Sequence, residues 1–311
     1  MNSGFSTLAI EFLLIDLFIA IGALYALRYF QGLLIGVDTT TELASKDNYA
    51  FGISCAGGTL ALALVLAGAV TGETHTVLAS EALSVAVYAG LGIILLKLGS
   101  IINDRIIFHR FSIKTQIREQ NTAAGIVQAA NLVALGSIIN TSAQWVDSES
   151  PMGALVVVLL FFLAQLVLLM TTRLRGLVYR RRHHGATLQG AIENGNAALA
   201  IRYLGHVLGA ALAVKAASGL IPYPLGGDLG QIFSAGAGNQ SMALITLGAQ
   251  WLFVSLIITI VISALAGIAR HAVLRNINVI EEVDDQQNIG VAFIEATLFI
   301  AVGLIVSSLF G

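Results

Sequence analysis

The feature that most constrains this chain is a series of eight long apolar segments separated by short polar connections. Crossing the hydrocarbon core of a bilayer takes about 20 apolar residues in a helix. The predicted spans are residues 8–33, 49–71, 81–103, 122–143, 153–172, 196–218, 242–268 and 289–310. No proline lies within any of them, so we expect eight unbroken helices.

The composition excludes a water-soluble fold. Of 311 residues, 57% are hydrophobic and 11% are charged, whereas a soluble domain carries about 45–50% apolar and about 25% charged residues. The same apolar content excludes disorder. We therefore expect an all-α polytopic membrane protein whose main partner is the lipid bilayer.

The distribution of basic residues predicts the orientation. Of 16 Lys and Arg residues, thirteen lie in the first, third, fifth and seventh connections or at the adjoining helix ends. The even connections and both termini carry none. The positive-inside rule places the odd connections in the cytoplasm and both termini outside. Because the first segment lacks a basic flank and a cleavage site, we expect it to be a retained helix.

The chain also repeats internally. The residues around Asn48 recur around Asn196, at an offset of 148, and those around Asn121 recur around Asn288, at an offset of 167. The second offset is larger because the second half has a longer outer loop, at about 219–241.

We expect two four-helix repeats, residues 1–147 and 148–311. Since each contains an even number of spans, both have the same orientation, and their pseudo-twofold axis lies along the membrane normal.

These motifs resemble a known family. The residues that carry the resemblance are Glu42 with Asp47-Asn48-Tyr49-Ala50, Asn121-Thr122-Ala123-Ala124-Gly125, Glu193 with Gly195-Asn196-Ala197-Ala198, and Asn288 to Ala292. They are similar to those of the YjfL-like bacterial inner-membrane proteins, a four-helix domain of unknown function that occurs singly or in tandem. The resemblance implies a location in the bacterial inner membrane and no particular reaction. The second repeat departs from it by lacking the Thr-Ala-Ala-Gly string.

Asn48, Asn121, Asn196 and Asn288 each stand at the cytoplasmic start of a predicted helix. Asn is a preferred N-cap because its side-chain oxygen accepts a hydrogen bond from the first turn. In the alternative interpretation, four helix N-termini converge on a vestibule that favours an anion. We favour the capping role.

Polar groups within the spans are the main functional candidates, since charge is costly there. They are Glu11, Asp16, Lys97, Gln128, Asn131, Arg202, His206, Lys215 and Glu295. With a helix rise of about 1.5 Å per residue, four of them are expected to lie about 9–10 Å from the cytoplasmic face. These four are Lys97, Gln128, Arg202 and Glu295. We predict a polar layer in which Glu295 neutralises Arg202 or Lys97, with a structural ion pair and a permeation role equally favoured.

The other intramembrane candidates have separate interpretations. Asp16 has no basic residue expected at its depth, which favours titration or contact with a solute. Lys215 is expected to snorkel or to meet Glu11 near the outer face. Asn131 and His206 fall near the middle of the membrane, and His206 is expected to be a packing histidine on a GxxxG face.

Arg180, Arg181 and Arg182 form a basic run beside the fifth span. Such a run can bind anionic lipid headgroups, although a purely topogenic loop is the favoured interpretation. No sequence motif for nucleotide hydrolysis, metal-dependent proteolysis or nucleophilic catalysis is present. We therefore expect no enzyme activity, no cofactor, no metal and no nucleic-acid partner.

Two functions remain open. The leading hypothesis is a conduit or transporter for an ion or small solute, an arrangement compatible with a homo-oligomer. The alternative is a non-transporting scaffold or partner subunit in which the intramembrane charges are structural.

Overall fold

The computed structural model describes residues 7–70, 78–145, 151–221 and 237–310, and within these ranges the chain is helical and contains no strand. Eight of the described helices are long and apolar enough to cross a membrane. They are α1 (Thr7–Ile35), α2 (Tyr49–Val70), α3 (Leu78–Ile102), α5 (Thr122–Trp145), α6 (Pro151–Arg182), α8 (Ala197–Leu220), α10 (Ala237–Val273) and α11 (Ile289–Phe310). The predicted all-α membrane fold is confirmed.

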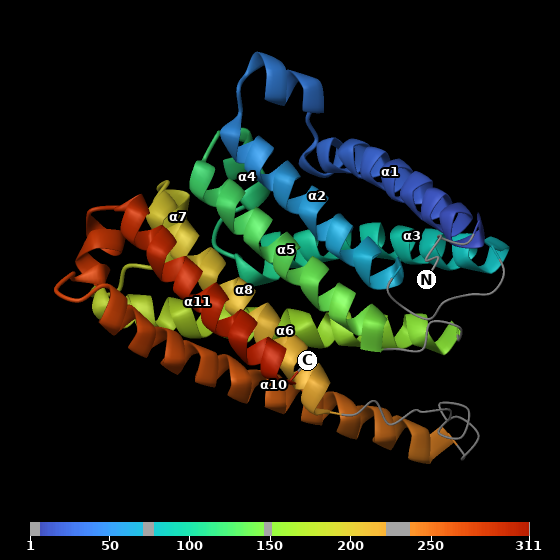
Figure 1. The fold of residues 1–311 in the computed structure, drawn as a ribbon. Coiled ribbons are helices and arrows are strands. Elements are labelled where there is room, and N and C mark those ends of the chain that lie inside the picture. Colours follow the sequence, from blue (N-terminus) through green and yellow to red (C-terminus); the bar gives the residue numbers. More distant parts are fainter. Residues whose placement is uncertain (1–6, 71–77, 146–150, 222–236, 311) are drawn as a thin grey trace, which may run out of the picture.

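Short helical elements occupy the connections at one end of the bundle (Figure 1). They are the π-helical turns η1 (Thr41–Ser45), η2 (Asn103–Ile107) and η3 (Glu281–Asp285) and the helices α4 (Ile113–Arg118) and α7 (Leu188–Glu193). The sequence predicted plain connections here, because elements of five or six residues are too short to leave a periodic pattern. The predicted outer loop at about 219–241 lies mostly outside the described residues.

Two helices extend beyond their predicted spans. Helix α6 continues to Arg182 and α10 continues to Val273. The hydropathy pattern ends where basic residues begin, but the backbone remains helical past that point. As a result, Arg175 of α6 and Arg270 of α10 lie on helices and are half-buried, whereas the three arginines at the end of α6 are exposed.

The centre of the molecule is a row of four helices in the order α2, α5, α8, α11 (Figure 1). Small residues allow their close approach. A Cβ atom on Gly57 of α2 would overlap Ala129 of α5, and one on Gly205 of α8 would overlap Ala296 of α11. These two contacts are equivalent at the repeat offsets of 148 and 167. The two repeats therefore share the same internal packing.

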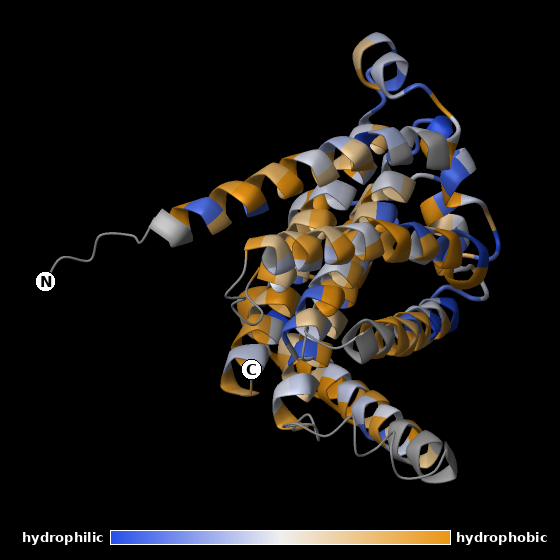
Figure 2. Ribbon diagram, turned by 90° about the vertical axis from the view of Figure 1, so that its right-hand side faces the viewer, coloured by the Kyte–Doolittle hydropathy of each residue, from blue (hydrophilic) through white to orange (hydrophobic). Residues whose placement is uncertain are grey.

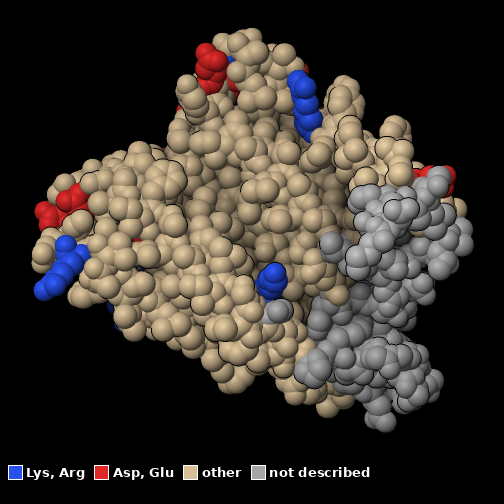
Figure 3. Space-filling model, viewed as in Figure 1, with Lys and Arg blue, Asp and Glu red and all other residues tan. Residues whose placement is uncertain are grey.

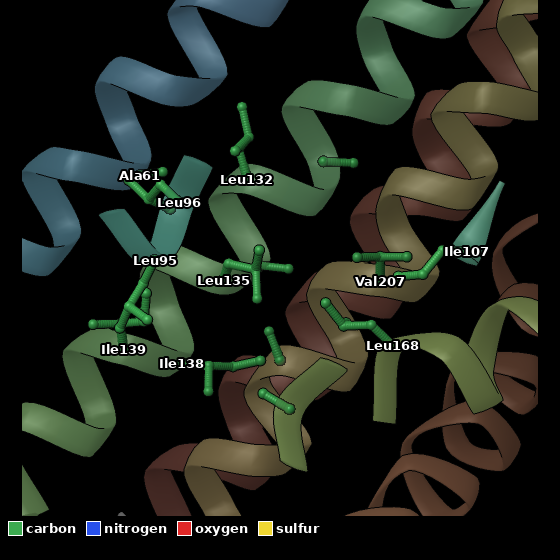
Figure 4. Packing of buried hydrophobic residues seen from close by; sticks show 14 of the residues in the cluster. Ala61, Leu95, Leu96, Ile107, Leu132, Leu135, Ile138, Ile139, Leu168 and Val207 are labelled. Atoms are coloured by element: carbon green, nitrogen blue, oxygen red, sulfur yellow. The ribbon is translucent and has the colours of Figure 1, made fainter. Parts of the chain in front are cut away.

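The repeats also share one hydrophobic core. Leu135 of α5, Leu168 of α6 and Val207 of α8 belong to a single buried cluster (Figure 4). Helix α6 thus packs at the boundary between the repeats, against helices of both.

Polar and apolar residues are separated along the helices. The long helices are largely apolar along their length, and hydrophilic residues gather mainly at the helix ends and connections (Figure 2). One face of the molecule carries its charged side chains mostly at the edges (Figure 3). This arrangement matches a bilayer on the sides and water at the ends.

Candidate functional site

The strongest polar cluster is built around Arg202 of α8, which is 8% exposed. Its Nε donates to Glu295 Oε2 of α11 at 2.5 Å, its Nη1 donates to Asp284 of η3, and its Nη2 donates to the carbonyl of Val279 at 2.8 Å. Bonds from all three nitrogens hold the guanidinium in a fixed orientation.

A second arginine shares the same carboxylate. Arg270 Nη1 of α10 donates to Glu295 Oε1 at 2.7 Å. The sequence placed Arg270 among the residues that set orientation, at the end of the seventh span, because hydropathy could not show that α10 continues past it. Glu295, 1% exposed, therefore bridges two cations.

A cavity of about 120 Å³ lies beside this cluster, lined by residues of α6, α8, α10, α11 and η3. Its charged lining consists of Arg175, Arg182, Arg202, Arg270, Asp284 and Glu295. Four arginines thus face two carboxylates, and the lining has an excess of positive charge. Arg175 of α6 donates to Ser263 Oγ at 2.9 Å, and its guanidinium lies 5.4 Å from the centre of the Phe299 ring.

His206 contributes a buried polar atom to the same cavity. The side chain is 7% exposed, and its ring packs edge-on against Phe299 with ring centres 4.0 Å apart. Its Nδ1 atom has no hydrogen-bond partner. The contact with Phe299 agrees with the predicted packing role. The Nδ1 atom, in addition, is a hydrogen-bonding group that the protein does not use. Buried polar atoms are rarely left in that state.

Asp284 covers the cluster from outside the membrane-spanning helices. Burial raises the pKa of this carboxyl above its ordinary value of 3.8, an effect that Arg202 and His183 oppose. His183 Nε2 lies 3.4 Å from Asp284 Oδ2. Among its neighbours, Arg202 most favours the ionised form of this carboxyl group.

The equivalent position in the first repeat has a different chemistry. The counterparts of Arg202, His206, Glu295 and Phe299 there are Ser54, Gly58, Gln128 and Leu132. They line a cavity of about 40 Å³ whose described lining contains one charged residue, Lys97. The same helix packing thus forms in the first repeat without the ion cluster.

The predicted polar layer is divided between the two repeats. Glu295 meets Arg202, but Lys97 and Gln128 lie in the first repeat, where Gln128 bonds Asn103 at 2.8 Å and Ser100 at 2.5 Å. Neither lines the arginine-rich cavity. Residues at one depth can still lie on different sides of a bundle, which the sequence could not show.

Other candidates lie away from this site. Asn131 Oδ1 accepts from Tyr203 at 3.0 Å, which joins α5 to α8. Glu11 and Lys215 are both exposed, and no ion pair joins them within the described ranges. Asp16 is half-buried on α1 and has an interaction partner.

The four asparagines cap their helices. The Oδ1 atoms of Asn48, Asn121, Asn196 and Asn288 accept from the backbone N–H of Phe51, Ala124, Leu199 and Val291, respectively. The amide nitrogens donate to other protein groups: Glu42 Oε2, Gln116 Oε1, the Asp284 carbonyl and Glu282 Oε2, in the same order. With both ends occupied, these side chains are satisfied by the protein itself.

The basic run divides between two surfaces. Arg180, Arg181 and Arg182 are all exposed. Arg182 reaches the arginine-rich cavity, whereas Arg180 lines a separate groove with Arg110 and Arg173. The described lining of that groove contains no acidic residue.

Sequence reasoning missed three members of the site: Arg175, Arg270 and Asp284. The two arginines were assigned to helix ends. Asp284 belongs to a run of acidic residues, and the sequence does not show which residue of that run is buried. In the described ranges no group of three or more His, Cys, Asp and Glu residues is arranged to hold a metal ion.

Comparison with protein families gives one finding. The family model of a domain of unknown function, DUF350, matches the chain twice, over residues 4–143 and 149–310. Comparison with curated proteins and with solved structures gives no match. The family match agrees with a tandem duplication and assigns no activity.

Proposed function

Because the chain belongs to the DUF350 family, whose function is unknown, we propose a function from its site: a membrane conduit for a small anion, bound in the arginine-rich cavity of the second repeat. The proposal does not involve catalysis. It narrows the expected cargo from any ion or small solute to a negatively charged ion.

The observation that carries the proposal is the excess of positive charge in the cavity lining, where four arginines, one buried, two half-buried and one exposed, face two carboxylates. Charges within a membrane protein are costly and are normally neutralised by partners. Arg202 is matched by Glu295 and Asp284, whereas among the described residues Arg175 forms no ion pair. Its direct contacts are a hydroxyl and an aromatic ring, and it shares the charge of Glu295 with the other arginines of the cavity. A small anion at this position supplies the missing counter-charge.

The geometry suits such a ligand. The cavity, of about 120 Å³, is large enough for a small ion. Arg175 and Arg182 approach it from α6, and Arg270 approaches it from α10. His206 Nδ1 donates to the ion in the tautomer that carries its proton there.

The scaffold alternative explains the first repeat better than the second. If the arginine cluster served only to hold helices together, the first repeat would need an equivalent. Its counterparts Ser54 and Gln128 are neutral, yet α2 and α5 pack in the same way as α8 and α11. The charged cluster is therefore an addition to the fold.

Anion flux into proteoliposomes tests the proposal, with chloride, inorganic phosphate and acetate as separate probes. A hydrogen bond to a charged group contributes about 1.5–3 kcal/mol, so Arg175→Gln is expected to weaken apparent affinity for the transported anion at least about tenfold. Arg28 is an exposed arginine on α1, the helix that corresponds to α6 in the first repeat, and Arg28→Gln provides a control that keeps wild-type flux.

Glu295→Gln is expected to change the apparent affinity in the opposite direction from Arg175→Gln, because it removes the carboxylate that competes with a bound anion for the arginines. Its apparent affinity is expected to rise. Wild-type flux and affinity in both Arg175→Gln and Glu295→Gln, with folded protein by size exclusion, would overturn the proposal.

A further inference from the structure

The two repeats contact each other through one side of the central row. Helix α5 of the first repeat packs on α8 of the second, where Asn131 accepts a hydrogen bond from Tyr203. Helix α6 packs against both. Helices α5, α6 and α8 therefore form the main part of the boundary between the repeats, with smaller contacts from α3, η2 and α7.

Because the chain is a tandem duplicate, each boundary helix has a counterpart. These counterparts are α11 for α5, α1 for α6, and α2 for α8. The matching Gly57–Ala129 and Gly205–Ala296 contacts show that the counterparts have the same faces turned inward. The outward faces of α2 and α11 therefore correspond to the faces of α8 and α5 that form the boundary within the chain. Helices α2 and α11 stand at the two ends of the row (Figure 1).

Burial differs strongly between the two sets. In the apolar part of each span, 83% of α5, 78% of α8 and 56% of α6 is buried. The corresponding values are 39% for α11, 44% for α2 and 11% for α1. The remaining pair, α3 and α10, does not follow this pattern, with 39% and 22%. The difference in burial from the counterpart helix is thus largest for α1, α2 and α11, the helices that lack a boundary partner, although α3 and α10 are also sparsely buried.

Individual residues show the same relation. Ala56, Thr59 and Ala63 of α2 are exposed, and their counterparts on α8 are Leu204, Val207 and Ala211, which are half-buried, buried and buried. Ile294, Thr297 and Ile305 of α11 are exposed, and their counterparts on α5 are Val127, Ala130 and Ile138, all buried. The exposed positions at each end of the row match positions that are covered inside the chain.

We propose that copies of this chain associate head to tail, with α11 of one copy packed on α1 and α2 of the next. The contact repeats the one between α5 and α6–α8 within the chain. It is heterologous, since different surfaces meet, and it forms a closed ring when the rotation between repeats closes. Lipid can cover these faces, but the internal boundary supplies a protein surface of matching shape.

The equivalence also predicts which residues meet. The counterparts of Asn131 and Tyr203 are Leu298 on α11 and Cys55 on α2. The polar pair inside the chain is thus replaced by an apolar pair between copies. Cys55 is the single cysteine of the chain, and it provides a native probe at the proposed contact.

Cross-linking in native membranes tests the arrangement. Leu298→Cys, treated with a short bifunctional thiol reagent, is expected to give a ladder of covalent dimers and larger species, because residue 298 of one copy reaches Cys55 of the next. Single-thiol chains (wild type, and Leu298→Cys combined with Cys55→Ser) should remain monomeric on denaturing gels. Ile257→Cys, on the exposed side of α10, is the placement control and should give no ladder.

Disruption gives a second, independent measurement. Ala63→Trp places a large ring on the outward face of α2 and is expected to convert the oligomer to monomer by native mass spectrometry. Ala264→Trp, at an exposed position of α10, should leave the oligomer intact. A wild-type chain that is monomeric in the membrane by single-molecule photobleaching, or equal cross-linking of the Leu298→Cys and Ile257→Cys variants, would overturn the proposal.

Discussion

At the scale of single residues, the starts of α2 and α11 are each held by a glutamate–asparagine pair. Glu42 accepts from Asn48 at 2.8 Å, and Glu282 accepts from Asn288 at 2.8 Å, six residues apart in both cases. Each asparagine also caps the first turn of its helix. The glutamate therefore orients the cap, and its contribution depends on its charge.

Glu42 is 3% exposed and also accepts from Lys46 at 2.7 Å. Hydrogen bonds from Lys46 and then Asn48 hold the pKa of Glu42 below its ordinary value of 4.5. Ionised Glu42 thus stabilises the folded chain above about pH 4.5, and this contribution is lost as pH falls through the lowered folded value.

We expect Glu42→Gln to reduce the free energy of unfolding near pH 7 by about 1–2 kcal/mol. The difference from wild type should shrink below pH 4.5. Thermal unfolding in detergent across pH 3–8 measures both effects. Glu119→Gln, which removes an exposed carboxylate, is the control. A difference that is constant with pH would contradict the ionic role of Glu42.

At the scale of helices, the central row depends on small residues at the crossing points. A Cβ on Gly125 or Gly136 of α5 would overlap the backbone of Ala50 or Ala61 of α2. Between helices in lipid the hydrophobic effect supplies little attraction, so close packing is the main source of association. The glycines therefore determine how closely the pairs approach.

Gly57→Val and Gly205→Val are each expected to destabilise the fold by about 1–3 kcal/mol, because the added atoms meet the backbone of the partner helix. Gly90→Val is the matched control, since a Cβ there meets no atom within 4 Å. Thermal midpoints in detergent provide the measurement. Equal midpoints for the Gly57→Val and Gly90→Val variants would show that the α2–α5 contact is loose.

At the scale of the whole molecule, the ends of the bundle differ. The short elements η1, η3, α4 and α7 lie at one end, and the beginning of α1 and the end of α11 point away from it (Figure 1). From the positive-inside rule we predict that the end with the short elements lies in the cytoplasm. The arginine-rich cavity, covered by η3, then opens on the cytoplasmic half of the membrane.

Reporter fusions test this orientation. Alkaline phosphatase fused after Gly311 is expected to be active, because it folds only outside the cytoplasm, while green fluorescent protein at the same position should be dark. Fusions after Glu119, in the connection that follows α4, should give the reverse result. Fluorescence of the C-terminal fusion, together with an inactive C-terminal phosphatase, would contradict the proposed topology.

Much of the fold could be predicted because it depends on local properties of the chain. Hydropathy located eight spans, and the recurrence of Asn48 at Asn196 and of Asn121 at Asn288 revealed the repeat. Capping was predictable for the same reason, since an N-cap bonds to a residue three positions away. The short elements were missed because one or two turns leave no periodic signal.

The candidate site was predicted only in part. The pairing of Arg202 with Glu295 followed from depth, but depth alone also placed Lys97 and Gln128 with them. The sequence by itself thus determined the membrane fold, the duplication and the helix starts, because each follows from neighbouring residues. Only the tertiary structure decided that Arg175, Arg270 and Asp284 surround one cavity and that no other helix of the described chain covers the outward faces of α1, α2 and α11. The reason is that the position of a side chain around a bundle depends on how distant helices rotate and pack.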